Sequence, residues 1–209
     1  SHSRENRFDS FVAGIGPRAT PTIDEGIVYA LTASGVLLAI NGADGAVLWE
    51  HDLPADYGLS PEQELATILY GRANSPLVVG PLVIVPAGGL PGGRLTSLVA
   101  FDKKSGKLAW KVARNYECPT EGDHSYTTPI VVLHEGKEAI LVWGAERLTL
   151  HSAADGKIIW SCAGFNPEQR SNWVTVASPV ISAGIAVVPY GRGERLAGIR
   201  LGGKGDVTA

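Results

Sequence analysis

The chain has 209 residues, 44% of them hydrophobic and 19% charged, a composition that excludes a disordered protein. Its net charge of -3 and its scattered Lys and Arg residues exclude nucleic acid as a partner. No apolar segment is long enough to span a bilayer. Residues 1–10 are polar and show no signal peptide, but the chain does not start with Met, which leaves export open.

A Ser/Thr-Pro pair followed by apolar residues occurs four times along the chain. Two β-rich runs follow each pair, as in residues 26–33 and 35–40 after the first one. The prolines stand at positions 21, 76, 129 and 179, so the unit repeats every 50 to 55 residues. This spacing predicts four similar β-units, which we place at residues 18–53, 72–112, 124–162 and 175–209.

Each of the first three units ends with a tight turn that lies four residues before a tryptophan. Glycine in such a turn adopts the positive φ that a right-twisting hairpin needs. The constant offset puts the indoles at equivalent places on the outer strands, where we expect structural wedges that donate their N–H to a backbone carbonyl. The glycines are Gly45, Gly106 and Gly156, and the tryptophans are Trp49, Trp110 and Trp160. The fourth unit has no closing tryptophan, so we expect it to be incomplete.

Residues 54–71 form an insertion between the first two units, and they contain a predicted short helix. Ser60 is the expected N-cap, and Pro61 occupies the first helical position.

The predicted strands are apolar on both faces, as in residues 28–33 and 82–87, so neither face of a sheet can lie in water. Radial stacking covers both faces of each sheet and leaves short edges exposed. The sequence therefore predicts an all-β fold, a β-propeller of four-stranded antiparallel blades with about four blades present.

This blade pattern resembles the tryptophan-docking repeat of pyrroloquinoline-quinone (PQQ)-type propellers. That family includes the quinoprotein alcohol dehydrogenases and the outer-membrane protein assembly lipoprotein. The resemblance runs from about Gly16 to the end of the chain, and the family's Ala-x-Asp before the turn is retained at 100–102, weakened at 39–41 and replaced at 150–152. It implies a ring of seven or eight blades, of which this chain is a part, and a periplasmic or secreted location.

The first strand of a propeller blade is the innermost one, so residues just before each Ser/Thr-Pro pair should gather at the mouth of the central channel. Arginine and aromatic side chains there would suit an anionic or planar ligand, or a peptide. The alternative is that they bond neighbouring loop carbonyls and close the channel. These candidate cofactor-binding or ligand-binding residues are Arg18, Arg72, Asn74, His124, Tyr126, Asn172 and Trp173, with Arg192 and Glu194 as weaker candidates.

Other motifs predict no catalytic chemistry. Residues 14–19 match a dinucleotide fingerprint as a string, but Pro17 and the strand that follows do not fit it. The five histidines show no metal-ligand spacing and no nucleophile motif is present, so we expect neither a catalytic residue nor a metal site. Cys118 and Cys162 either pair or remain buried thiols.

Two functional hypotheses follow. The first is a non-catalytic binding or scaffold module of the bacterial cell envelope, which engages protein, peptide or glycan through its loops and joins the remaining blades of the same propeller. The second is part of a PQQ-dependent alcohol or sugar dehydrogenase. The resemblance implies that such an enzyme holds its quinone between an indole and a disulfide of adjacent cysteines, with calcium nearby. This chain has no adjacent cysteines, so we favour the first hypothesis and expect no cofactor in these residues, with PQQ and calcium possible in the full-length protein.

An arc of about four blades leaves one face of the first blade and one face of the last without a neighbour. We expect each face to expose apolar side chains. On the fourth unit, the expected residues are Ile185, Val187, Ile199 and Leu201.

Overall fold

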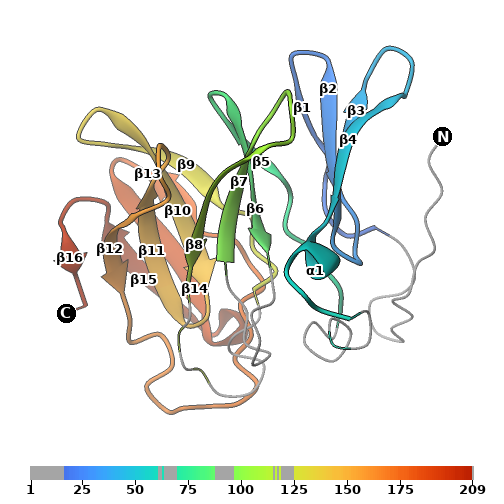
Figure 1. The fold of residues 1–209 in the computed structure, drawn as a ribbon. Helices are drawn as coiled ribbons and strands as arrows, with labels where there is room; N and C mark the ends of the chain where they lie inside the picture. Colours follow the sequence, from blue (N-terminus) through green and yellow to red (C-terminus); the bar gives the residue numbers. More distant parts are fainter. Residues whose placement is uncertain are drawn as a thin grey trace. The chain divides into compact units, whose positions relative to one another are not determined.

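The computed structural model describes residues 17–60, 63, 70–87, 97–114, 116, 118 and 125–208. The chain forms two compact units, residues 1–114 and 115–209, and each unit contains two β-sheets (Figure 1).

Unit 1 contains two four-stranded antiparallel sheets whose strands follow one another in chain order. The first sheet comprises β1 (Thr22–Asp24), β2 (Ile27–Leu31), β3 (Val36–Asn41) and β4 (Val47–Asp52). The second comprises β5 (Leu77–Val79), β6 (Leu82–Ala87), β7 (Ser97–Asp102) and β8 (Leu108–Ala113). A meander of four short strands is the blade of a propeller, so the predicted all-β fold is confirmed.

Unit 2 contains the third and fourth sheets. The third comprises β9 (Ile130–His134), β10 (Lys137–Gly144), β11 (Arg147–Ser152) and β12 (Ile158–Cys162). The fourth has three strands, β13 (Val180–Ser182), β14 (Ile185–Tyr190) and β15 (Arg195–Arg200), with the 3-10 turn η1 (Gly191–Gly193) between the last two.

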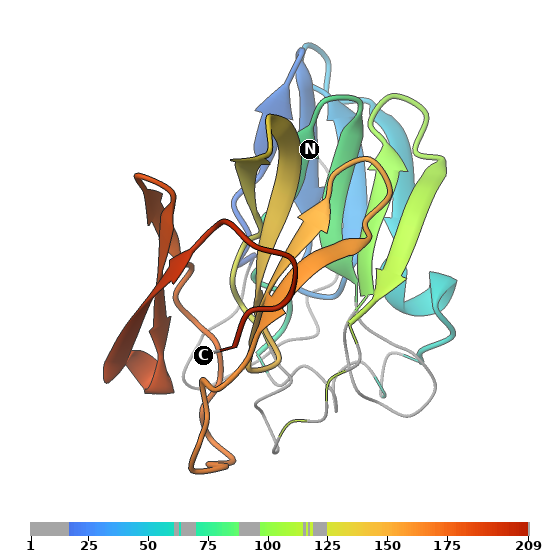
Figure 2. The same cartoon turned by 90° about the vertical axis from the view of Figure 1, so that its left-hand side faces the viewer.

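The last strand, β16 (Gly205–Asp206), does not extend the fourth sheet. It pairs in parallel with β12 at the outer edge of the third sheet, and the next residue, Val207, donates its N–H to Ser161 O at 2.8 Å. Figure 2 shows the chain crossing from β15 to this edge. The sequence did not predict this pairing, which covers backbone groups that an edge strand otherwise exposes.

The turn before each tryptophan has the same hydrogen bonds in all three complete sheets. Asn41, Asp102 and Ser152 each donate a backbone N–H across the turn, at 2.8, 2.8 and 2.9 Å. A β-bulge then shifts the register just after the residue opposite each tryptophan. The turn glycines have φ values of 79°, 70° and 72°, as the hairpin signal predicts.

Each unit has its own apolar core between its two sheets. In unit 1, Tyr29, Leu37 and Ala39 of the first sheet pack in one cluster with Val83 and Phe101 of the second. In unit 2, the cluster joins the third and fourth sheets, and its members include Leu141, Leu150, Trp160, Ala186 and Val188. Packing neighbouring sheets face to face explains why their strands are apolar on both faces.

Four residues of the fourth unit were predicted to lie on one exposed face, and the prediction is wrong for Ile199 and Leu201. Ile185 and Val187 are half-buried and share a face with Val180, which is 67% exposed. Ile199 and Leu201 instead pack in the core against the third sheet. Ile199 pairs with Ala186 and not with Val187, and this register puts its side chain on the opposite face.

One short helix, α1 (Leu53–Asp56), follows β4, and Asp52 caps it by accepting the Ala55 N–H at 3.1 Å. The helix predicted after Ser60 lies largely outside the described residues. Ser60 and Gln63 are described and exchange the reciprocal hydrogen bonds of a capping box, at 2.8 and 3.2 Å. Within the described part of the chain, no helix has the length and apolarity needed to cross a membrane.

Candidate functional site

In unit 1, two side chains of the first sheet converge on one carbonyl of the second sheet. The Trp49 indole donates to Lys103 O at 3.1 Å, and the Tyr29 hydroxyl donates to the same oxygen at 3.0 Å. The indole lies against Gly106, where an added Cβ would come within 2.8 Å of the ring. His51 stacks on Phe101 with ring centroids 4.2 Å apart.

Unit 2 repeats this arrangement with a different second donor. The Trp160 indole, which is fully buried, donates to Leu201 O of the fourth sheet at 3.2 Å. His134 Nδ1 lies 3.2 Å from the same oxygen and donates to it in the tautomer that carries a proton there. Trp110 is half-buried on β8.

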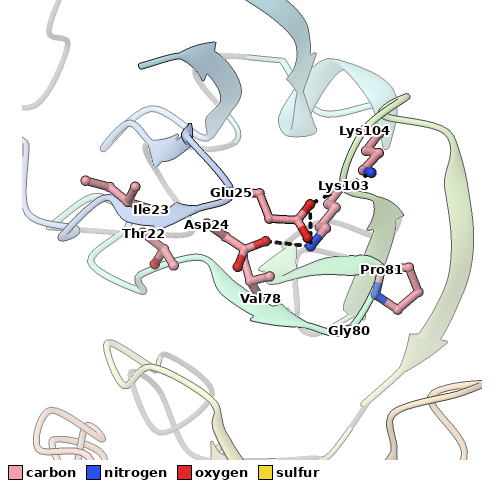
Figure 3. Close-up of a pocket in the computed structure, with 9 residues that line it drawn as sticks. All are labelled: Thr22, Ile23, Asp24, Glu25, Val78, Gly80, Pro81, Lys103 and Lys104. Atoms are coloured by element: carbon pink, nitrogen blue, oxygen red, sulfur yellow. Dashed lines mark hydrogen bonds and ion pairs between the residues drawn. The ribbon is translucent and has the colours of Figure 1, made fainter. Parts of the chain in front are cut away.

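A hollow of about 700 Å³ opens beside the Lys103 side chain in unit 1. Its lining comes from the β1–β2 turn of the first sheet and from two turns of the second (Figure 3). Lys103 Nζ lies 2.5 Å from Asp24 Oδ2 and 3.4 Å from Glu25 Oε2. Lys104 Nζ approaches Glu25 at 3.8 Å. The hollow is therefore lined by an ion-pair network that links the two sheets.

The chemistry of this hollow does not suit a nucleophilic lysine. Hydrogen bonding to Asp24 raises the pKa of Lys103, and the bond to Glu25 acts in the same direction. The ammonium therefore stays charged, while a lysine nucleophile needs a depressed pKa. The network holds the sheets together through charge and offers a ligand few groups that are not already paired.

Three of the predicted ligand-binding residues lie in unit 1. Arg72 is 3% exposed, and its Nη1 donates to Pro86 O at 3.2 Å. Asn74 is buried, and Arg18 is half-buried. The Ser/Thr-Pro pairs that follow these residues are neighbours, because the Thr20 N–H donates to Ser75 Oγ at 3.0 Å. Arg72 thus bonds to a carbonyl of strand β6, and ligand binding by these three residues stays a prediction.

The other candidates fall in unit 2, except that His124 lies outside the described residues. Asn172 is exposed, Trp173 is buried, and Tyr126 is half-buried. The Tyr126 N–H donates to Thr175 O at 2.9 Å, so the two loops run side by side. Ligand binding by any of these residues stays a prediction.

An arginine pair around Trp173 was missed by the sequence analysis. Arg170 and Arg195 each place a guanidinium 5.1 Å from the Trp173 ring, and both bind Glu168, at 2.5 and 2.7 Å. Hydrogen bonds from Arg195 and then Arg170 lower the pKa of Glu168, so this carboxylate is charged at neutral pH. Only the proximity of the segment between β12 and β13 to the start of β15 could have revealed this cluster. We call it the Trp173 surface and define it as Glu168, Arg170, Asn172, Trp173 and Arg195.

Beneath the Trp173 surface, aromatic rings contact one another from Trp143 through Phe165 and Tyr190 to Trp173. A cavity of about 10 Å³ lies among them, enough for a single water molecule. Among the residues that the structure describes, the buried indole N–H of Trp143 meets no hydrogen-bond acceptor. This cluster is rigid and apolar, and it supports the polar surface above it.

The described residues do not fit a quinone and its calcium ion. Cys118 and Cys162 are both buried and stand far apart in the sequence, so they cannot form a disulfide of adjacent cysteines. Burial raises the pKa of the Cys162 thiol, which keeps it protonated and unreactive. Across 17–60, 70–87, 97–114 and 125–208, no group of three His, Cys, Asp or Glu residues could hold a metal ion.

Comparisons with known proteins agree with the blade geometry. The family model described as outer membrane protein assembly factor BamB matches residues 6–197. The dehydrogenase subunit of the quinone alcohol dehydrogenase of Gluconobacter oxydans (strain 621H) is 28% identical over 168 residues, covering 74% of this chain and 20% of that protein. The chain thus spans about a fifth of the length of this curated relative.

Two solved structures share the fold. BamB from Moraxella catarrhalis has a TM-score of 0.60 at 18% identity and covers 88% of this chain and 50% of that one. The quinohemoprotein alcohol dehydrogenase ADHIIG from Pseudomonas putida HK5 has a TM-score of 0.61 at 21% identity, covering 84% and 28%. Since the family match extends over most of the sequence, the chain belongs to the family of outer membrane protein assembly factor BamB, whose repeat is the PQQ-type propeller blade.

Proposed function

We propose that this chain is a non-catalytic module that binds protein segments in the periplasm of a bacterial envelope. The observation that carries the proposal is the Trp173 surface, where two arginines, joined by one carboxylate, lie over the buried Trp173 ring next to the exposed residue Asn172. Arginine and aromatic groups held rigidly in this way are typical of protein-binding hot spots. The match to an assembly factor for outer membrane proteins supports a protein as the partner.

The binding proposal is tested with a fluorescent 12-residue peptide that alternates apolar and polar residues, as an outer-membrane strand does. We expect anisotropy to detect saturable binding to the native chain. Asn172→Glu, on the Trp173 surface, should weaken it roughly tenfold, the effect of one contact of about 1.4 kcal/mol. Arg192→Glu should do the same, because the exposed Arg192 lies in η1 next to Gly191, which borders Trp173. Lys157→Glu, in an exposed turn of the same unit, is the matched control and should bind like wild type. Equal losses in the control, or no saturable binding, would contradict the proposal.

A second candidate, part of a PQQ-dependent alcohol or sugar dehydrogenase, is favoured by the quinone-dependent relatives. The cysteine arrangement argues against it in this chain. The test is to add the quinone with Ca²⁺ and an alcohol, and to record the quinone absorbance and the reduction of an electron-accepting dye. We expect neither to change. Quinone retained through gel filtration, together with dye reduction, would establish the enzyme instead.

We further propose a purely structural role for the three outer-strand indoles and their turn glycines. The seating of Trp49 on Gly106 and the hydrogen bond of Trp160 to Leu201 support this role for two of them. The repeat extends this proposed role to Trp110, Gly45 and Gly156.

A further inference from the structure

The Trp173 surface lies in a segment whose charge differs from that of the rest of the chain. Residues 164–203, which include all five of its members, contain four arginines and two glutamates but no lysine or aspartate. The segment therefore has a net charge of +2, whereas the whole chain has a net charge of -3. The planar guanidinium of arginine matches the geometry of a carboxylate, and the lysine ammonium does not. This composition is typical of a surface that binds carboxylates.

A carboxylate of the chain itself occupies the two arginines of this surface. Glu168 Oε2 lies 2.5 Å from Arg170 Nη2, and Glu168 Oε1 lies 2.7 Å from Arg195 Nη2. Arg195 also forms a side-chain hydrogen bond with Tyr190. Among the described residues, neither arginine forms a further ion pair. A guanidinium carries five N–H donors, so each arginine retains donors for another acceptor. The Glu168 side chain is 42% exposed, which leaves it room to move aside.

The arginines are held in position by the fold of unit 2. Both guanidinium groups lie 5.1 Å from the centre of the buried Trp173 ring. Asn166, which is 4% exposed, accepts the Arg170 N–H at 3.0 Å and donates to the Arg170 carbonyl at 2.9 Å. Gln169 has a φ of 53°, a left-handed conformation that persists in a non-glycine residue only where the surrounding structure fixes it. Donors that are already ordered lose little entropy on binding, which favours recognition at this surface.

A third arginine borders the Trp173 surface. Arg192 lies in η1 directly after Gly191, which packs against the Trp173 ring. Arg192 is exposed, and no described residue forms a hydrogen bond or ion pair with its side chain. Glu194, the second glutamate of the segment, is exposed as well and does not pair with it. One positive charge beside the arginine pair is therefore not neutralised, and it attracts anionic groups.

We propose that the Trp173 surface, together with Arg192, binds an acidic side chain of a protein segment, and that Glu168 occupies the same arginines until that segment binds. The inference rests on the proposed function and names the chemistry that the partner presents. The incoming carboxylate accepts hydrogen bonds from Arg170 and Arg195, and Glu168 moves into solvent. The match to an assembly factor for outer membrane proteins favours a protein over an anionic lipid as the source of the carboxylate.

The test compares three fluorescent 12-residue peptides that differ only at two central positions, which hold Glu, Gln or Lys. Both peptide ends are blocked, so that the termini carry no charge. By anisotropy with the 209-residue chain, the Glu peptide should bind roughly tenfold more tightly than the Gln peptide, and the Lys peptide more weakly still. Equal binding of the Glu and Gln peptides would overturn this inference and leave the proposed binding of protein segments standing. No binding of any peptide would contradict both.

Two further ligands distinguish the source of the carboxylate or anion. The Gln peptide with a free C-terminal carboxylate should bind no better than its blocked form. If it binds as tightly as the Glu peptide, the surface recognises a chain end, and the proposal of an acidic side chain is wrong. Phosphatidylglycerol vesicles should not displace the Glu peptide. Displacement by them would identify an anionic lipid as the ligand and overturn the proposal as well.

Variants of the ion pair separate recognition from a merely structural role. Glu168→Gln removes the competing charge and should tighten binding of the Glu peptide about two- to fivefold, the effect of one exposed ion pair. Arg170→Gln should weaken it roughly tenfold. Glu135→Gln is the matched control, because it breaks an exposed pair with Lys204 in the same unit, and it should bind like wild type. Unchanged or weaker binding by Glu168→Gln, with thermal unfolding like that of wild type, would overturn the proposal.

Discussion

The two units join their sheets in the same way at the backbone but differ in the side chains around the joint. In both, one carbonyl of the following sheet accepts an indole N–H and one further donor. That donor is the Tyr29 hydroxyl in unit 1 and the His134 ring in unit 2. The repeat thus fixes the acceptor through its turn geometry, while the second donor can come from a different strand.

The charged contacts beside the two joints differ more. In both units a lysine after the third strand meets a glutamate of the first turn, Lys103 with Glu25 and Lys204 with Glu135 at 3.4 and 3.3 Å. Lys103 is 8% exposed and also binds Asp24, whereas the Lys204 side chain is 72% exposed. We infer that the indole contributes to stability in both units and that the ion pair does so mainly in unit 1.

The largest expected effect is the loss of a tryptophan. Trp160→Ala should lower the free energy of unfolding of unit 2 by about 3–5 kcal/mol, because removing a fully buried aromatic leaves a cavity and takes one hydrogen bond from the Leu201 carbonyl. Trp49 is only half-buried, so Trp49→Ala should cost unit 1 less. Urea unfolding followed by hydrogen exchange at assigned amides measures each unit separately. Equal costs of under 1 kcal/mol would break the comparison.

Substitutions of the turn glycines test the contact between the Trp49 ring and Gly106. Gly106→Ala and Gly45→Ala impose similar strain, because both glycines have positive φ. Only Gly106→Ala also drives a methyl group into the Trp49 ring, so it should cost about 1–3 kcal/mol more. Thermal unfolding of the two variants compares them directly, and an identical loss would contradict the seating of Trp49.

The second donor should matter less than the indole. Tyr29→Phe removes one hydrogen bond to Lys103 O and should cost about 1 kcal/mol, because Trp49 still satisfies that carbonyl. Burial raises the pKa of Tyr29, so the unfolded chain loses this proton first as the pH rises through about 10. Wild type should therefore lose stability above that pH, and Tyr29→Phe should lose less. Parallel pH profiles for the two proteins would exclude this contribution.

The ion pairs should give the smallest effects and the clearest contrast between the units. The folded-state pKa of Lys103 is raised, so its stabilisation is complete below the unfolded value of about 10.5 and is lost as the pH rises through the folded value. Lys103→Met should therefore be less stable than wild type at pH 8, with a difference that shrinks by pH 11.5. Lys204→Met, the exposed control, should match wild type closely at both values.

The sequence predicts the repeated parts of this fold because they depend on local backbone geometry. Gly45, Gly106 and Gly156 stand in turns that demand positive φ, and a fixed offset then sets the position of each tryptophan. It does not predict β16, because a two-residue strand has no periodicity to recognise.

The candidate site is less accessible to sequence reasoning. Trp173 and Asn172 were singled out from their place before a Ser/Thr-Pro pair, but Arg195, which lies over the Trp173 ring, is the first residue of the separate strand β15. The burial of Arg72 was also hidden, since a charged residue becomes buried only where a carbonyl such as Pro86 O is within reach. Such contacts arise from the folding of distant segments, which spacing alone does not encode.

The claim that an indole joins the sheets of each unit is tested most directly by NMR on the ²H,¹³C,¹⁵N-labelled chain. The experiment detects scalar coupling across a hydrogen bond from an indole Nε1–H to a carbonyl carbon. We predict correlations from Trp49 to the carbonyl of Lys103 and from Trp160 to that of Leu201, with both indole protons protected from exchange. Indole protons that exchange with water as fast as free tryptophan and show no such coupling would contradict the account.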